Sequence, residues 1–172
     1  MIADYCDTPT CKPKCQVQSN GNLVPNAGFD RVNWVYGGSL EFASQTFWQS
    51  TDATGCENSG SVQIGSMGSI LSDCFPVQSG LNYFFGFMFR AVNFDPAFQN
   101  CGVAWFTDGS CTNGTAPNSG TNPMPGSGWQ KTPSTGLTAP ATALSALIFC
   151  ANGKDFGFEV DRFYFNATAP AF

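Results

Sequence analysis

The sequence predicts an all-β fold, a two-sheet antiparallel β-sandwich of the jelly-roll type. Short apolar runs recur between clusters of Gly, Asn, Pro and Ser, and helical periodicity is absent. Aromatic residues make up 15% of the chain, whereas charged residues make up only 11%. This balance is typical of secreted all-β proteins. A length of 172 residues suits one domain with a complete core.

About eight strands are expected between the turn signals, a number that suits two packed sheets. They lie near residues 40–48, 61–65, 69–77, 81–92, 101–107, 129–137, 143–151 and 156–166. The segment NYFFGFMFRAV alternates most clearly, with Tyr83, Phe85, Phe87 and Phe89 on one face. That face is predicted to be core. Arg90 lies on the other face, where we expect it to meet either a ligand or an acidic partner in a surface salt bridge.

Eight cysteines and no histidine indicate disulfides rather than a zinc site. We expect all eight to be oxidised in an extracellular, secreted protein, because disulfides persist outside the cytosol. The cysteines are Cys6, Cys11, Cys15, Cys56, Cys74, Cys101, Cys111 and Cys150.

The charge and its distribution exclude some partners. Seven basic and twelve acidic residues give a net charge of -5, and the basic residues form no stripe, so we expect no nucleic-acid partner. No apolar run reaches the roughly 20 residues that span a bilayer, so no membrane association is expected. Two sequons, at Asn113 and Asn166, are compatible with secretion.

The chain divides into two parts by composition. Residues 1–21 contain three cysteines and little apolar content, and they are predicted to form a disulfide-tied leader. The globular unit is predicted to cover residues 22–172. We expect a monomeric module of a larger secreted protein.

Five segments occur in an order and spacing that resemble one family. They are NLVPNAGFD, NSGSVQIG, CFPVQSGLNYFFGFMFRAV, SGWQKTPSTGLTAPATA and FEVDRFYF, and together they extend over residues 22–166. This pattern resembles the carbohydrate-binding modules of families four, nine and twenty-two, which share a galactose-binding-like jelly roll. The resemblance implies a non-catalytic module that binds a polysaccharide or oligosaccharide. A secreted adhesion or structural module is the alternative.

The resemblance also implies a structural calcium ion where the first and last strands meet. A hard cation of this kind takes oxygen ligands only. Carried over to this chain, Asp161 would be the main carboxylate, Asp30 stands where relatives carry Glu, and backbone carbonyls would come from Gly28 and Gly60. The alternative is that Asp30 caps a turn and Asp161 pairs with Arg31 or Arg162.

Sugar-binding surfaces combine aromatic rings, which stack on the C–H faces of sugars, with side chains that hydrogen-bond the hydroxyls. Tyr36 is the first candidate, because it follows Trp34 in a context similar to a cleft-lining segment of the relatives. Trp48, Arg90 and Trp105 complete the predicted set, with a core role as the alternative for each tryptophan. Trp129 is expected to be structural.

The late strand departs from the relatives. A rough alignment places Ala146 and Cys150 where cellulose-binding members carry cleft glutamines, which argues against β-1,4-glucan binding in the usual way. Three disulfides are considered. Cys101 could pair with Cys150, crosslinking the floor of a cleft, or with Cys111 across a hairpin, and Cys56 could pair with Cys74.

Catalysis is the least favoured function. The absence of histidine excludes catalytic triads and histidine-ligated copper. A glycosidase would need two carboxylates separated by roughly 5 to 9.5 Å. Glu41 and Asp95 are the best available pair, although neither lies in a recognisable catalytic context.

Overall fold

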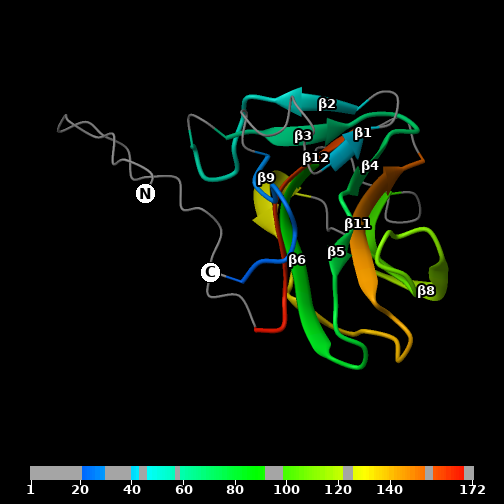
Figure 1. Ribbon diagram of the computed structural model, residues 1–172. Helices are drawn as coiled ribbons and strands as arrows, with labels where there is room; N and C mark the ends of the chain where they lie inside the picture. The colour runs from blue at the N-terminus through cyan, green and yellow to red at the C-terminus, as the bar shows by residue number, and fades with distance from the viewer. Residues whose placement is uncertain are drawn as a thin grey trace, which may run out of the picture.

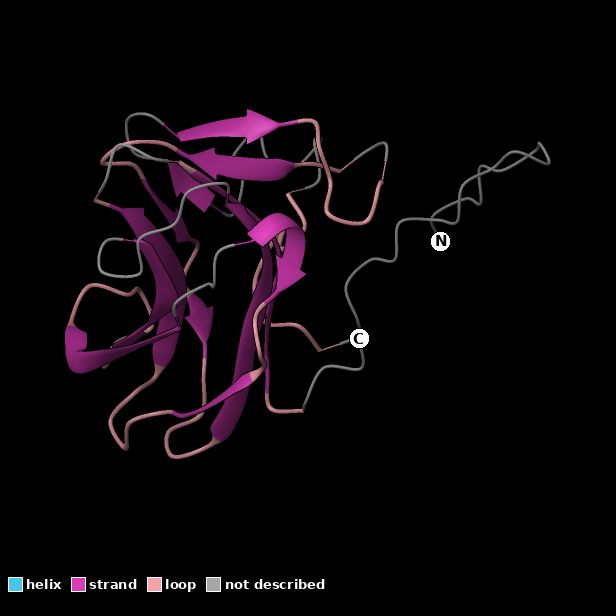
Figure 2. Ribbon diagram, turned by 180° about the vertical axis from the view of Figure 1, so that it is seen from behind, coloured by secondary structure: helices cyan, strands magenta, loops and turns pink. Residues whose placement is uncertain are grey.

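The computed structural model describes residues 21–29, 40–42, 46–56, 59–91, 99–121, 126–153 and 157–168. Within these ranges the chain forms strands and turns but no helix (Figures 1 and 2). Asp30, Tyr36 and the leader cysteines Cys6, Cys11 and Cys15 lie outside the described residues. The part of the chain that is described contains no helix long and apolar enough to cross a membrane.

The strands are arranged in two antiparallel sheets, which we call sheet A and sheet B. Sheet A contains β1 (Leu40–Phe42), β4 (Ser69–Ser72), β5 (Phe75–Pro76), β7 (Gln99–Phe106), β8 (Gly114–Thr121) and β11 (Ser145–Asn152). Sheet B contains β2 (Thr46–Gln49), β3 (Ser61–Ile64), β6 (Asn82–Ala91), β9 (Gly126–Lys131), β10 (Thr135–Thr138) and β12 (Phe158–Asn166).

Strand order follows a sandwich topology. Sheet A runs β1-β4-β11-β7-β8, with β5 beside β11, and sheet B runs β10-β6-β12-β3-β2, with β9 beside β6. The two sheets face each other across one hydrophobic core (Figure 1). The predicted all-β sandwich is therefore confirmed.

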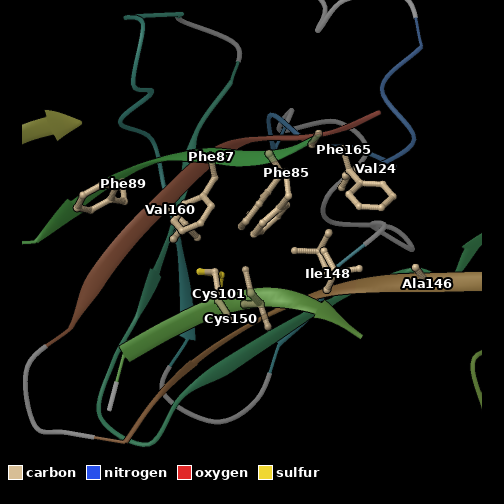
Figure 3. Packing of buried hydrophobic residues seen from close by; sticks show 14 of the residues in the cluster. Val24, Phe85, Phe87, Phe89, Cys101, Ala146, Ile148, Cys150, Val160 and Phe165 are labelled. Carbon is tan, nitrogen blue, oxygen red and sulfur yellow. A yellow bond between two sulfur atoms is a disulfide. The ribbon is translucent and has the colours of Figure 1, made fainter. Parts of the chain in front are cut away.

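The core is built mainly from aromatic side chains. On β6, Tyr83, Phe85, Phe87 and Phe89 are each at most 2% exposed, as the alternation predicts. Figure 3 shows the β6 rings pointing toward the β7 and β11 side chains of the opposite sheet. Phe165 of β12 stacks on Tyr83 with ring centroids 4.7 Å apart. Aromatic pairs in such offset arrangements contribute beyond the apolar area that they bury.

The N-terminal segment 22–29 lies along the last strand. The Leu23 N–H donates to the Phe165 carbonyl at 2.9 Å, and the Phe163 N–H donates to the Ala27 carbonyl at 2.9 Å. The Asn22 side chain contacts two residues of β12, donating to the Phe163 carbonyl and accepting from the Phe165 N–H. The start of the module therefore meets its last strand, as the family resemblance implies.

Two disulfides are fully described, and they decide between the predicted pairings. Cys101 pairs with Cys150, and Cys74 pairs with Cys111. The alternatives Cys101–Cys111 and Cys56–Cys74 are therefore wrong, although Cys56 is also disulfide-bonded. Cys101 and Cys150 are cross-strand neighbours of β7 and β11, and both are fully buried (Figure 3). This disulfide lies in the core between the sheets, so the expectation that it crosslinks the floor of a cleft is also wrong.

The strands differ from the sequence-based expectation in four places. The expected strand 40–48 is divided into β1 and β2, which lie in different sheets, and the expected strand 69–77 is divided into β4 and β5. The segment GTAPNSGT forms β8, which pairs with β7, although no strand was expected there. The expected strand 129–137 is divided into β9 and β10. Between them, Thr132 is buried, and its hydroxyl accepts from the Phe87 N–H at 2.9 Å.

Candidate functional site

Asp161 is a buried carboxylate at an irregular point of β12. The register between β12 and β6 shifts between Asp161 and Tyr164, and Arg162 adopts a positive φ of 50°. The Asp161 side chain is 0% exposed, and its carboxylate accepts from the backbone N–H of Ala53 at 2.9 Å and of Arg162 at 2.6 Å. The turn that contains Ala53 therefore packs directly on this carboxylate.

Burial changes the acidity of this group. Removal from water raises the pKa of Asp161 to about 8, and the nearby Asp52 carboxylate contributes to the rise. The two N–H donors act in the opposite direction but do not offset the loss of water. At neutral pH this position therefore favours either a proton or a cation.

Asp52, the carboxylate next to Asp161, is surrounded by further polar groups. The Asp52 carboxylate accepts from the N–H groups of Thr54 and Cys56, and it also interacts with the Ser59 hydroxyl. Partial burial opposes ionisation of Asp52, but these hydrogen bonds prevail and lower its pKa. The Ser59 hydroxyl donates to the Gly28 carbonyl at 2.5 Å. One hydroxyl thus links the Gly28 carbonyl to the Asp52 carboxylate.

These residues fit a calcium ion in their donor chemistry. Calcium takes carboxylate and carbonyl oxygens with irregular geometry. Among the described residues, no three His, Cys, Asp or Glu side chains group as a metal site, so backbone oxygens would have to contribute. Asp52 was not singled out from the sequence. Its position in a Thr-Asp-Ala-Thr-Gly turn resembles any surface turn, and nothing there signals its closeness to Asp161.

Gly60 has a packing role that is independent of a metal. A Cβ at this position would collide with the Gln49 carbonyl and the Trp48 ring. Glycine is therefore required for β2 and β3 to approach each other closely. The Trp48 ring is held in place from two sides. It packs against Gly60, and its indole N–H donates to the Phe29 carbonyl at 3.2 Å. Trp48 is half-buried and packs against the core, so only part of its surface is open.

Trp105 cannot stack on a ligand at the surface. It is 1% exposed, and its ring lies 6.4 Å from the Tyr83 ring and 5.9 Å from the Phe165 ring. On β7 it shares the inward face with Cys101 and Val103. The prediction that Trp105 contacts sugar is therefore wrong, and the core alternative is correct.

Arg90 lies on the outer face of sheet B and forms an ion pair. Its Nη2 atom is 2.7 Å from both carboxylate oxygens of Glu159, its cross-strand neighbour on β12. Its guanidinium also lies over the Trp129 ring, 5.2 Å from the centroid. The predicted salt bridge is thus present, with the guanidinium also packed on an aromatic ring.

The outer face of sheet A is largely apolar where β4, β7 and β11 meet. Phe149 is half-buried there, with Leu71 of β4 and Gly102 of β7 as its cross-strand neighbours. Leu71 is 38% exposed. Ala146 and Cys150 point the other way, into the core, so the alignment that placed them in a cleft is wrong by one residue. Leu147 and Phe149 take the outward positions instead.

No protein-family model and no curated protein matches this chain. Solved structures match it in fold. The enzymatically active domain of bacteriophage CBA120 tailspike protein 4 gives a TM-score of 0.65 at 13% identity, over 84% of this chain and 21% of that one. This chain therefore spans only about a fifth of that protein.

Carbohydrate-binding modules are also among the matching structures. The family 22 module and glycoside hydrolase of Clostridium thermocellum xylanase 10B, solved with xylohexaose, gives a TM-score of 0.57 at 11% identity, over 90% of this chain and 30% of that one. A family 16 carbohydrate-binding module gives 0.55 at 11% identity, over 84% of this chain and 99% of that one. At these identities the likeness is one of fold, and it agrees with the two-sheet antiparallel sandwich of this chain.

Proposed function

We propose that this chain is a non-catalytic module that binds a polysaccharide, exported to an oxidising compartment as part of a larger protein. The observation that carries the proposal is Phe149, a partly exposed ring on the outer face of sheet A, with Leu71 and Gly102 as its cross-strand neighbours. Surface aromatic rings present a large rigid apolar area at a low entropic cost.

The match to a whole family 16 module supports the same reading, because this chain aligns with 99% of it. Fold alone does not define function, so the surface residues have to carry the argument. The buried Cys101–Cys150 disulfide would hold β7 and β11 together beneath Phe149, so that the outer face stays rigid. Disulfides are also consistent with export, because they persist outside the cytosol.

A catalytic role is less well supported by the described carboxylates. Asp161 has the raised pKa expected of a general acid, but it is fully buried and out of reach of a sugar. Glu159 is held by Arg90, and Asp108 accepts hydrogen bonds from the loop 110–113, which lower its pKa. Glycoside hydrolysis needs two carboxylates that flank the scissile bond.

Calcium would act in this module as a stability device. Asp161 and Asp52 would supply carboxylates, and the Gly28 carbonyl, which Ser59 already contacts, would supply a backbone oxygen. Asp30 remains a proposed ligand, and so does the Gly60 carbonyl. A cation at Asp161 would compensate the charge that burial disfavours, and it would fix the N-terminal segment against β12.

Pull-down on insoluble xylan, cellulose, chitin and mannan tests the proposal. We expect the wild-type protein to be retained by at least one of them, without release of reducing ends. Retention should be lost in Phe149→Ala and kept in Leu144→Ala, which removes a side chain that is 55% exposed elsewhere. Release of reducing ends would instead make the protein an enzyme.

A further inference from the structure

The outer face of sheet B carries a row of five side chains, one from each of five neighbouring strands. Arg90 of β6 faces Glu159 of β12, Glu159 faces Gln63 of β3, and Gln63 faces Phe47 of β2. Trp129 of β9 extends the row, because its ring lies 5.2 Å below the Arg90 guanidinium. We call these five residues the sheet B row.

The register fixes the face on which the row lies. Cross-strand partners share one face of a sheet, and adjacent residues along a strand point to opposite faces. Val160 is the partner of both Val62 and Phe89, and all three are buried in the core. The neighbouring row therefore points outward.

The exposure of the row is graded from its centre to its edge. The side chain of Glu159 is 16% exposed and that of Arg90 is 35% exposed. Phe47, at the edge strand, is 58% exposed, which is unusual for a large aromatic residue with apolar neighbours available in the core. Trp129 at the other end is half-buried. The row therefore has an aromatic ring at each end and polar groups between them.

The polar centre is ordered by hydrogen bonds. The Glu159 carboxylate accepts from Arg90 and from the hydroxyl of Ser61, at 3.2 Å. Gln49 donates to the Gln63 Oε1 atom at 2.7 Å. Groups held in this way lose little conformational freedom when a ligand binds.

Hydrogen-bonding capacity nevertheless remains. Both bonds from Arg90 to Glu159 come from Nη2, so its Nε–H and Nη1 groups donate to no other described residue. The Gln63 Nε2 group likewise donates to none of the described residues. The free groups at the centre are therefore donors, and the paired charges of Arg90 and Glu159 cancel.

We propose that the sheet B row is a second binding surface for a neutral, hydroxyl-rich glycan chain that runs across the strands. The exposed Phe47 ring would stack on a sugar face, and the free N–H groups of Arg90 and Gln63 would donate to hydroxyl oxygens. Five strands about 4.8 Å apart give the row a length of roughly 19 Å, enough for several consecutive sugar rings. This inference rests on the proposed function, and it places an additional site on the sheet opposite Phe149.

Calorimetry with xylohexaose, cellohexaose and mannohexaose tests the row. We expect Phe47→Ala and Gln63→Ala each to weaken binding of the recognised hexasaccharide at least about fivefold, the equivalent of about 1 kcal/mol. Phe47→Trp should restore it, because the aromatic face returns. Leu144→Ala is the matched control, since Leu144 is 55% exposed, close to the 58% of Phe47, and lies in the loop before β11.

Nuclear magnetic resonance gives a readout that does not depend on substitution. The Arg90 Nε–H and Trp129 indole N–H signals should shift on titration with the same hexasaccharide. The second binding surface would be rejected if these signals did not shift and if Phe47→Ala and Gln63→Ala bound with full affinity. If Phe149→Ala lost binding in the same experiment, the proposed function would still stand. Failure of the folded wild-type protein to bind any of the three probes would contradict the sheet B row, and failure to be retained by any of the four insoluble polysaccharides as well would contradict the proposed function.

Discussion

Arg90 and Glu159 face each other across β6 and β12, with Arg90 Nη2 2.7 Å from both carboxylate oxygens. The pair is only partly exposed, so its charges are less screened than those of a typical surface ion pair. A double-mutant cycle with Arg90→Gln and Glu159→Gln should give a coupling free energy of about 1 kcal/mol in urea unfolding. The coupling should shrink at high salt. A value near zero at low salt would mean that the pair is structurally present but energetically neutral.

Asp161 makes the stability of the metal-free protein depend on pH. Burial raises the pKa of Asp161 from 3.8, its value in an unfolded chain, to about 8, so between these values the folded state retains a proton that the unfolded state has released. The free energy of unfolding therefore falls as pH rises from 4 to 8. In chelator, the melting temperature should drop on the order of 5 °C or more between pH 5 and pH 8.

The matched control for this pH effect is Asp161→Asn. Asparagine is similar in shape but carries no charge, so the slope of stability against pH between 5 and 8 should flatten. An unchanged slope would assign the pH dependence to another group.

Calcium should counteract the loss of stability that ionisation of the buried Asp161 causes as pH rises. A ligand that binds only the folded state raises its stability, by about 2.7 kcal/mol at a concentration one hundred times the dissociation constant. Because protons and calcium would compete for Asp161, the increase in melting temperature should be larger at pH 8 than at pH 5. Differential scanning calorimetry in calcium and in chelator measures this. Identical melts in the two buffers at pH 8, with wild-type protein, would argue against a calcium site.

Trp105 should matter for stability rather than for recognition. Its ring packs against Tyr83 and Phe165 at 1% exposure, so Trp105→Ala would leave a large cavity. We expect a loss of about 3–5 kcal/mol in the free energy of unfolding. Trp105→Phe should cost clearly less and should bind glycans like the wild type. Lost binding in a stable Trp105→Phe protein would restore Trp105 as a recognition residue.

The two described disulfides should differ in what their removal costs. They close loops of 37 and 49 residues, for which the loop-entropy model predicts nearly equal contributions of about 4 kcal/mol. Cys101 and Cys150 are also packed in the core, whereas Cys74 and Cys111 are only half-buried. Replacing Cys101 and Cys150 by Ala should therefore lower the melting temperature more than replacing Cys74 and Cys111. Equal losses would indicate that loop closure alone determines the effect.

The fold was largely predictable because alternation along the strands is a strong local signal. The aromatic face of β6 and the inward position of Val160 follow directly from a period of two. β8 was missed because GTAPNSGT contains Gly, Asn and Pro, which disfavour strands, and it becomes a strand by pairing with β7. The register of β8 on β7 depends on tertiary structure, so local strand propensity does not predict it.

The candidate site was predictable only in part, because it depends on cross-strand neighbours. Arg90 could be placed on the outer face from alternation, but its partners Glu159 and Trp129 come from other strands. For Trp105 the sequence left a binding role and a core role open, because only its place on the inward face of β7 shows that it is buried. The turn of Asp52 and Ala53 contacts Asp161 through the Ala53 N–H, and Ala53 and Asp161 are 108 residues apart in the sequence. No local sequence pattern predicts a contact over such a separation.

Affinity electrophoresis in gels that contain soluble xylan, β-glucan, galactan or galactomannan tests the central claim most directly. The account predicts that the wild-type protein and Leu144→Ala migrate more slowly in at least one of these gels than in a gel without polysaccharide, and that Phe149→Ala does not. Unchanged migration of the folded wild-type protein in every gel would contradict glycan binding and would favour an adhesion or structural role.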